Sequence, residues 1–369
     1  MIWSDEMRVK RHSWLAIFLV LILATTGCIK KQDPNGTNLP PKSNKPANSE
    51  PISRTEFLMD TVMTIRLYDK TDEEILDKVF NRLEEIEGRM SATIESSDIS
   101  NINNNAGIKP VTVNEDTYFV LGKAKEYAEL SNGAYDPTIG PLVDLWNILA
   151  EEKERESIPS DKDIEKKKTL IDYTKLELLD NNQVFLKGKN MEVVLGSIVK
   201  GYAADEVKRI LMENGVGAAI IDLGGNVFAY GEKPDGSLWK IGIRNPLEIT
   251  GNYLGIIQVR DRSIVTSGGY ERYFEYKGKT YHHILDTKTG YPAENEILGV
   301  SIISEKSIDG DALSTTLFVL GLDRGMDLVN SLEGVEAIFI TKDNSVYLTN
   351  DLKDKFILNS GTTFSIKEY

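Results

Sequence analysis

The order of strand-like and helix-like segments is the feature that most restricts the fold of this sequence. Residues 217–287 read almost entirely as strand and turn, and apolar residues at helical spacing precede them in 75–86 and 198–214. Two further helical patterns follow them, in 309–320 and 323–332. A parallel α/β fold would instead alternate strand and helix throughout. The sequence therefore predicts an α+β protein with mixed, mostly antiparallel sheets and packed helices, and it argues against a Rossmann domain.

Turn and capping signals mark the ends of further elements. Residues 55–68 are rich in Val, Ile, Thr and Tyr, which predicts a strand pair or one bent strand. Residues 71–74 (Thr-Asp-Glu-Glu) have the pattern of a capping box, so a helix is expected to begin there. Helices are also predicted over 114–133 and after Pro137, and the Asn-Asn pair at 181–182 predicts a hairpin.

Charge and composition exclude several functional classes. The 369 residues include 43 Lys and Arg against 57 Asp and Glu, a net charge of −14. A nucleic-acid-binding protein needs a basic surface that displaces counterions from phosphates, so nucleic acid is not an expected partner. One cysteine and three histidines exclude a disulfide scaffold and a Cys/His zinc site of standard spacing. The most charged stretch, 151–168, predicts a surface excursion.

The N-terminus has the pattern of an export signal that ends at a lipid-anchor site. Basic residues in 8–11 precede an apolar run over 14–24, which is short for a bilayer span but suits a signal-peptide core. Small residues then lead to Cys28, the only cysteine, and this junction resembles a bacterial lipobox. We expect residues 1–27 to be a signal peptide and Cys28 to be lipidated. The alternative is an ordinary signal peptide with a chance cysteine.

Residues 28–51 are proline-rich and polar, with almost no apolar side chain. Such a segment cannot bury enough apolar surface to fold, so we expect a flexible, lipid-anchored tether. It would hold a globular body, residues 52–369, at the extracytoplasmic face of the cell membrane.

Five segments in this body combine glycines, potential metal ligands or titratable groups. Asp311 and Thr315 are four residues apart on a predicted helix and would face one side, where a carboxylate and a hydroxyl suit Mg²⁺. Asp311 as a simple helix cap is the alternative. Lys200 near a helix start could hold a phosphate together with backbone amides, or be a solvated surface lysine. The segments are 133–138, 195–201, 222–226, 267–270 with 282–286, and 311–315.

His282 and His283 are adjacent on a predicted strand, so their side chains would point to opposite faces. Only one of them can then face a given cleft. A neutral imidazole is a natural general base near pH 7. A structural or surface histidine is the alternative for either position.

Taken in order, these segments resemble the FAD:protein FMN transferase family (ApbE-type flavin transferases) over about residues 55–350. The matching stretches are FLMDTVMTI, MSATIESSDIS, GAYDPTIGPLVDLWN, GSIVKGYAAD, DLGGN, VTSGGYERYF, HHILDTKTG and DALSTTLFVLG. The resemblance implies an ApbE-like fold with its active site in a cleft. It also implies an enzyme that uses Mg²⁺ and FAD, transfers FMN to a Ser or Thr hydroxyl of an extracytoplasmic or membrane redox protein, and releases AMP.

The resemblance further implies where the flavin dinucleotide binds. Met59 matches the flavin-contacting Met of a Met-Gly-Thr motif, written here Met-Asp-Thr, and Ile284 and Leu285 match residues beside the flavin. Lys200 matches the lysine of a Lys-Gly motif. The segment that holds the adenosine part is matched by Ala134, Tyr135 and Asp136.

The catalytic and metal positions are implied in the same way. His283 matches the proposed base, and Lys200 and Asp311 complete the expected catalytic set. The residues that match the Mg²⁺ site are Ser197 (through its backbone carbonyl), Asp311, Ser314 and Thr315.

Three positions depart from the family pattern. Thr93 stands where many relatives have a tyrosine against the flavin, Val194 where many have an aspartate, and Thr287 follows Asp286 in place of a proline. Two other functions stay open at this stage. One is an FAD pyrophosphatase that yields FMN and AMP, and the other is a non-enzymatic flavin-binding lipoprotein.

Overall fold

A hairpin forms the edge of the main sheet in the computed structural model, which describes residues 50–148, 156–248 and 252–369. Strands β1 (Ile52–Leu58) and β2 (Thr61–Leu67) pair antiparallel, which confirms the predicted strand pair. Their two-residue turn consists of Met59 and Asp60, both at positive φ (48° and 57°). This left-handed backbone matches the twist of a tight hairpin, and Asp is among the non-glycine residues that tolerate it.

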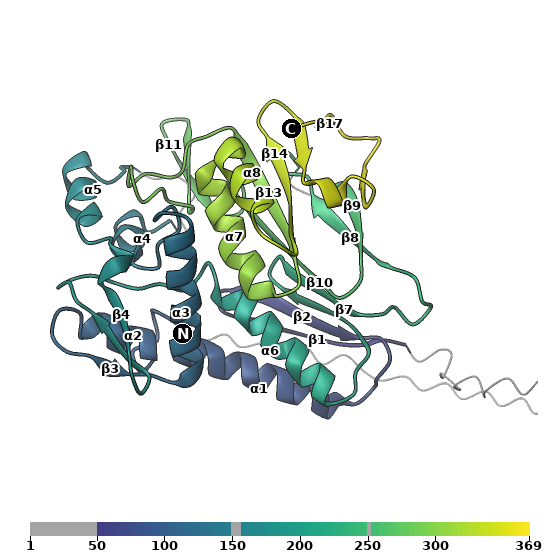
Figure 1. Cartoon of the computed structure of the whole chain (residues 1–369), viewed down its shortest axis with the longest axis horizontal. Helices are drawn as coiled ribbons and strands as arrows, with labels where there is room; N and C mark the ends of the chain where they lie inside the picture. The colour runs from purple at the N-terminus through teal and green to yellow at the C-terminus, as the bar shows by residue number, and fades with distance from the viewer. Residues whose placement is uncertain (1–49, 149–155, 249–251) are drawn as a thin grey trace, which may run out of the picture. The chain divides into compact units, whose positions relative to one another are not determined.

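The sheet that begins with this hairpin has nine strands, in the order β1-β2-β6-β7-β10-β13-β14-β15-β17 (Figure 1). Neighbouring strands are antiparallel except for the pair β15 and β17. The predicted α+β class with mostly antiparallel pairing is therefore confirmed. Beyond the hairpin the strands are β6 (Ala218–Leu223), β7 (Asn226–Gly231), β10 (Arg262–Gly268), β13 (Ile297–Ser304), β14 (Val335–Thr341), β15 (Ser345–Leu348) and β17 (Ser365–Lys367).

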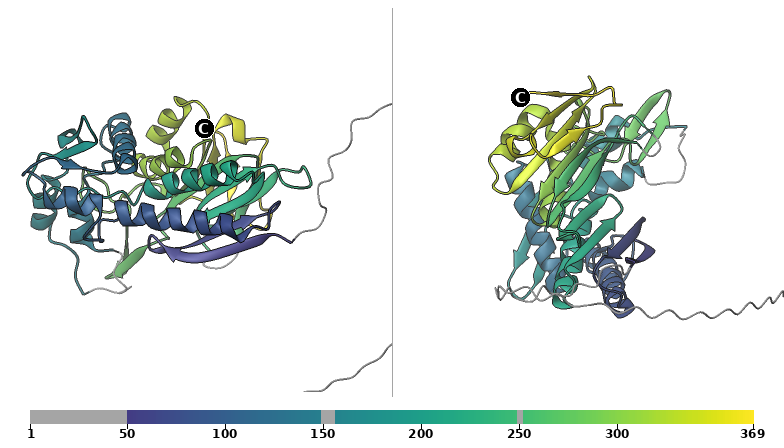
Figure 2. Two further views of the ribbon diagram at one scale, coloured as in Figure 1. Left: turned by 90° about the horizontal axis from the view of Figure 1, so that it is seen from below. Right: turned by 90° about the vertical axis from the view of Figure 1, so that its right-hand side faces the viewer.

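Helices cover one face of this sheet. Helices α1 (Glu73–Met90) and α6 (Val199–Glu213) run side by side along it, as both figures of the whole chain show (Figures 1 and 2). Helices α7 (Ser307–Leu320) and α8 (Leu322–Asn330) belong to the same hydrophobic core. The inward side chains of each strand, such as Ile65 of β2, alternate with residues on the other face and complete this core.

A second, smaller core lies on the opposite face of the sheet. A three-stranded sheet in the order β16-β9-β8 packs there against residues such as Ala229 and Ile338. Its strands are β8 (Trp239–Arg244), β9 (Tyr253–Val259) and β16 (Phe356–Leu358). The sheet is thus covered on both faces, as a layered α+β fold requires.

The remaining elements gather beyond the ends of α1 and α6 (Figure 1). The helices there are α2 (Asp98–Asn104), α3 (Glu115–Leu130), α4 (Gly140–Trp146) and α5 (Asp161–Lys168). The short strands are β3 (Val111–Thr112), β4 (Leu176–Leu179), β5 (Gln183–Leu186), β11 (Tyr273–Tyr276) and β12 (Lys279–His282). Two 3₁₀ turns, Tyr173–Lys175 and Asn350–Leu352, complete the described elements.

Several sequence predictions need correction. The capping box does not form at Thr71, because Asp72 is the N-cap and its carboxylate accepts the Glu74 N–H. A carboxylate one residue later is also well placed for the positive end of the helix dipole. The histidine pair is not wholly on a strand: His282 ends β12 and His283 follows it.

Two predicted segments lie partly or wholly outside the described residues. The charged stretch 151–168 is described only from residue 156, and its end forms helix α5 with Ile164 buried. The predicted signal peptide, Cys28 and nearly all of the tether precede residue 50. Among the residues that the structure describes, no helix is both long and apolar enough to cross a bilayer.

Candidate functional site

The close contact between α6 and α7 is the centre of the candidate site. A Cβ at Gly201 would lie 2.4 Å from the Ser307 carbonyl oxygen, so only glycine permits this approach of the two helices. Asp205 of α6 accepts N–H groups of Ser307 (2.8 Å) and Ile308 (3.0 Å). In return, Asp311 Oδ2 of α7 accepts the Gly201 N–H at 2.8 Å. Each helix therefore caps the N-terminus of the other, where backbone donors lack partners within their own helix.

Asp311 is the buried carboxylate of this contact. It is the fifth residue of α7, so it is not the cap of its own helix, and that alternative is wrong. Burial raises the pKa of Asp311, and the nearby charge of Lys200 and the amides at the start of α6 oppose the rise. The Lys200 ammonium donates to the Gly196 carbonyl at 3.0 Å. Lys200 and Asp311 are thus brought together as expected.

Ser314 and Thr315 follow Asp311 along α7. The Ser314 hydroxyl is fully buried, donates to the Asp311 carbonyl (2.9 Å) and lies 2.8 Å from the Ser267 hydroxyl at the end of β10. Thr315 is only partly buried, and its side chain has no hydrogen bond among the described residues. The described chain contains no group of three or more His, Cys, Asp or Glu side chains suited to a metal. The predicted Mg²⁺ ligands comprise one carboxylate, and the others are hydroxyl or carbonyl oxygens. This magnesium site stays a prediction.

The loop before α4 contributes the predicted adenosine segment. The Asp136 carboxylate accepts the Thr138 N–H (2.8 Å) and hydroxyl (2.7 Å) and the Tyr173 N–H (3.1 Å), so it is used to shape its own turn. Burial raises the pKa of Asp136, and these hydrogen bonds oppose the rise. Ala134 and Tyr135 are buried. A ligand at this segment would therefore meet backbone groups and the Tyr135 hydroxyl rather than a free carboxylate.

His283 and His282 have different surroundings. The Arg272 carbonyl accepts the His283 N–H (3.0 Å) and lies 3.2 Å from His283 Nδ1. A carbonyl can only accept, so Nδ1 carries the proton in this arrangement and Nε2 keeps a free lone pair. Burial, foremost, and then the charges of His282, Arg272 and Lys200 lower the pKa of His283 to about 3. His282 instead bonds the Ala293 carbonyl (3.0 Å) and packs edge-on against Phe318, which indicates a structural role.

The β1–β2 turn reaches the same region. Arg272 Nη2 donates to the Asp60 carbonyl at 2.9 Å, and the Met59 N–H donates to Glu87 Oε1 of α1 at 2.9 Å. Because Arg272 also holds His283, Met59 is brought to the histidine side of the site. Asp60 occupies the glycine position of the family motif at a positive φ.

The predicted flavin loop is tied to the adenosine segment. Ile284 and Leu285 are buried in two different hydrophobic clusters, and the Ile284 carbonyl accepts the Ala293 N–H at 2.9 Å. Thr287, at the position where relatives have proline, donates its hydroxyl to the Gly133 carbonyl at 2.6 Å. In a second hydrogen bond, Trp146 Nε1 donates to the Gly290 carbonyl at 2.7 Å. The two loops therefore keep a fixed separation.

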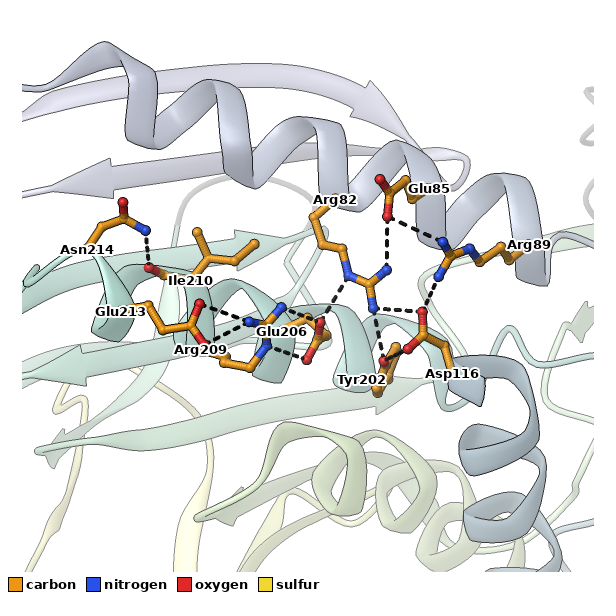
Figure 3. Close-up of polar contacts among 10 residues, drawn as sticks. All are labelled: Arg82, Glu85, Arg89, Asp116, Tyr202, Glu206, Arg209, Ile210, Glu213 and Asn214. Carbon is orange, nitrogen blue, oxygen red and sulfur yellow. Dashed lines mark hydrogen bonds and ion pairs between the residues drawn. The ribbon is translucent and has the colours of Figure 1, made fainter. Parts of the chain in front are cut away.

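A polar network that the sequence analysis missed positions α6. Arg82 of α1 reaches between α3 and α6 and bonds Asp116 (2.7 Å), Tyr202 (3.2 Å) and Glu206 (2.9 Å), as Figure 3 shows. Arg89 also pairs with Asp116, whose second oxygen accepts the Tyr202 hydroxyl at 2.8 Å. Burial alone would raise the pKa of Asp116, but hydrogen bonds from Arg82 and Tyr202 hold this pKa below its usual value. No short motif announces the network, since its members lie far apart in sequence.

Glu271 is a second group that the sequence analysis missed. Its side chain is exposed to solvent, and the charges of Lys200, Arg244 and Arg272 act on it. Desolvation by neighbouring groups, opposed by these cations, raises the pKa of Glu271. Its place directly after the 267–270 segment was the available signal. In a strongly acidic protein, this gathering of cations marks a local anion site.

Two departures from the family pattern and one cavity complete the description of this region. Thr93 is exposed and bonds only Ser91, and the Val194 N–H donates to the Pro137 carbonyl at 2.9 Å. A cavity of about 300 Å³ lies at the C-terminal end of α7, whereas Asp311 is near the N-terminal end. Its lining includes Asp286 and residues 293–296 and 319–324. The predicted active-site cleft stays a prediction.

Comparison with known proteins gives a consistent result. A profile of the ApbE family matches residues 59–339. An "FAD:protein FMN transferase" of Klebsiella pneumoniae is 36% identical over 311 residues, 84% of this chain and 95% of that protein. One of Treponema pallidum is 35% identical over 321 residues, 82% of this chain and 88% of that protein.

Solved structures agree with these sequence matches. The crystal structure of the ApbE protein from Thermotoga maritima has a TM-score of 0.76 at 29% identity. The solved structure of the flavin transferase ApbE from Vibrio cholerae has a TM-score of 0.75 at 26% identity. Each comparison covers 83% of this chain and 99% of the other.

Proposed function

Because this chain belongs to the ApbE family, we propose that it is an FAD:protein FMN transferase that depends on Mg²⁺. It would move the FMN half of FAD to a Ser or Thr hydroxyl of a redox protein and release AMP. The acceptor would be extracytoplasmic or in the membrane, reached from a lipid anchor at Cys28. The observation that carries the proposal is the position of Lys200, whose charge acts on both the buried Asp311 carboxylate and the neutral His283 imidazole.

Lys200 and its neighbours support the binding of a pyrophosphate. The chain has a net charge of −14, so a phosphate anion needs local positive charge to approach. Lys200 and Arg272 supply it, and Lys200 lies in the first turn of α6, where backbone N–H groups favour anions.

Oxygen donors around Asp311 support the binding of Mg²⁺. A buried carboxylate beside hydroxyl and carbonyl oxygens is the ligand chemistry that this hard cation prefers. The residues that would hold the ion are Ser197, Asp311, Ser314 and Thr315. When bound, Mg²⁺ would neutralise phosphate charge as the AMP leaving group departs.

His283 would act on the acceptor. Its Nε2 would take the proton of the acceptor hydroxyl as that oxygen attacks the FMN-side phosphorus and the bond to AMP breaks. A pKa of about 3 is low for a base, but it applies without a bound anion. The negative charge of a bound pyrophosphate would raise the pKa of His283 toward the working range.

The test is a mass measurement on the acceptor. The full-length chain is incubated with FAD and Mg²⁺, with and without a threonine-bearing flavin-acceptor domain, and AMP is followed alongside the acceptor mass. We expect the acceptor to gain one FMN with matching AMP, and EDTA to abolish both. AMP without labelling of any acceptor would indicate an FAD pyrophosphatase. Tight FAD binding without AMP would indicate a non-enzymatic flavin-binding protein.

A further inference from the structure

The Tyr135 hydroxyl is a buried polar group without a partner. The residue is 3% exposed, and its Oη has no hydrogen bond among the described residues. Buried hydroxyls in folded proteins are almost always bonded, because an unsatisfied one lowers stability. The Tyr135 N–H, in contrast, is anchored by the Ser131 hydroxyl at 3.0 Å, so the backbone at this position is fixed.

The groups nearest to this hydroxyl belong to the α6–α7 centre. The Ser197 hydroxyl lies near it without the geometry of a hydrogen bond, and the Asp311 carboxylate acts on it electrostatically. Burial raises the pKa of Tyr135, so the phenol is neutral and keeps its proton at physiological pH. The hydroxyl is therefore a hydrogen-bond donor beside Ser197 and Asp311, although its backbone belongs to the predicted adenosine segment.

We propose that Tyr135 Oη donates a hydrogen bond to a phosphate oxygen of the bound dinucleotide beside Asp311. This inference rests on the proposed function, since that function supplies the dinucleotide. A neutral donor suits a phosphate oxygen, and the bond is strong because the acceptor is charged. The free protein bears an unpaired hydroxyl that the ligand satisfies.

The matched comparison is Tyr135→Phe against Tyr127→Phe. Tyr127 is also buried, but its hydroxyl donates to Asp309 Oδ1 at 2.6 Å, so it already has a partner. Each substitution removes one oxygen from a buried ring. If Tyr135 Oη serves the ligand, Tyr135→Phe leaves the ligand-free melting temperature unchanged or higher, whereas Tyr127→Phe lowers it.

Binding of two probes to the full-length chain separates the phosphate from the nucleoside. Calorimetry with Mg²⁺ measures the affinity for ADP and for adenosine. We expect Tyr135→Phe to weaken ADP binding about tenfold and to leave adenosine unchanged, the size typical of one charged hydrogen bond. Tyr127→Phe should change neither affinity.

Two results would overturn the inference. An equal loss for ADP and adenosine would mean that Tyr135 shapes the nucleoside subsite, and an unchanged ADP affinity would mean that its hydroxyl serves no ligand. Either result would leave the proposed function standing if the wild-type chain still transfers FMN. If the wild-type chain binds neither FAD nor ADP, the proposed function fails and the inference fails with it.

Discussion

The two sides of the candidate site are built in different ways. On the α6–α7 side, Lys200 and Asp311 come from helix ends that cap each other through Gly201 and Asp205, with no spare space between them. On the loop side, the parts are turns joined through carbonyl oxygens, such as those of Asp60 and Arg272.

This difference separates stability from function. Caps and close helix contacts contribute to the free energy of unfolding, so changes on the α6–α7 side should affect both stability and activity. Single hydrogen bonds between loops fix geometry at little cost in stability. Changes on the loop side should therefore affect ligand binding or rate with only small changes in melting temperature.

The largest expected effect is on the rate of transfer. Phosphoryl transfer relies mainly on charge stabilisation and positioning, so Asp311→Ala should lower kcat/KM about 10³-fold. Loss of a general base typically costs less, and His283→Gln should lower it about 10²-fold. Steady-state transfer assays with both variants test the ranking, which is wrong if the histidine variant is slower.

Asp311→Asn provides the control for folding. Its amide oxygen can still accept the Gly201 N–H, but it lacks the charge of the carboxylate. We expect a melting temperature close to that of the wild type together with a rate close to that of Asp311→Ala. A large drop in melting temperature would show that Asp311 acts chiefly as a cap.

The next effect is on stability, through Gly201. A methyl group there would meet the Ser307 carbonyl at 2.4 Å, so Gly201→Ala must push α6 and α7 apart. We expect a loss of about 1–3 kcal/mol in the free energy of unfolding, as for overpacked cores, together with lost transfer activity. Gly196→Ala is the matched control, since nothing lies within 4 Å of its added Cβ. Equal unfolding curves for the two variants would contradict the close contact.

Another expected effect is the pH dependence of stability on the loop side. With the pKa of His283 lowered to about 3 from 6.5, the unfolded chain takes up this proton first as pH falls. The contribution of His283 to stability is therefore full above pH 6.5 and is lost progressively toward pH 3. His283→Gln should flatten this part of the stability curve.

NMR can check the same pKa directly. The imidazole signal of His283 should not shift between pH 8 and pH 5, and addition of ADP with Mg²⁺ should raise its pKa. Titration of His283 near pH 6.5 in the free protein would show that the site is more open to water than its contacts indicate.

The smallest effect is expected at Thr287. Thr287→Val removes the hydroxyl that donates to the Gly133 carbonyl and should weaken FAD binding a few-fold with little change in melting temperature. Thr287→Ser should restore the affinity. Thr289→Val is the control, because Thr289 bonds only the nearby Tyr291 N–H. An unchanged FAD affinity would show that the tie between the loops has no role in binding.

Local patterns predicted much of the fold. Helical spacing located α1, α6 and α7, and the Asn pair at 181–182, with φ of 57° and 54°, forms the predicted hairpin turn between β4 and β5. These signals are short-range, because they depend on which residues can adopt a turn or bury one face. The ends of helices and strands were predicted less accurately, as the shift of the α1 N-cap from Thr71 to Asp72 illustrates.

Some residues of the candidate site could be found from the sequence, and others could not. Lys200, Asp311 and His283 stood out as chemistry-bearing residues in the five segments singled out from the sequence, and the segment order carried the family resemblance. The network around Arg82 and the cations around Glu271 did not stand out, because their members meet only after long loops close.

By itself, the sequence determined the element types, the α+β class and the family, since these follow from local spacing and from motifs in a fixed order. Only the tertiary structure decided that Asp311 caps a neighbouring helix, that His283 lies beside the charges of Arg272 and Lys200 while His282 packs against Phe318, and that Tyr135 has an unpaired hydroxyl. Hydrogen bonds and burial depend on partners distant in the chain, and no local pattern names those partners.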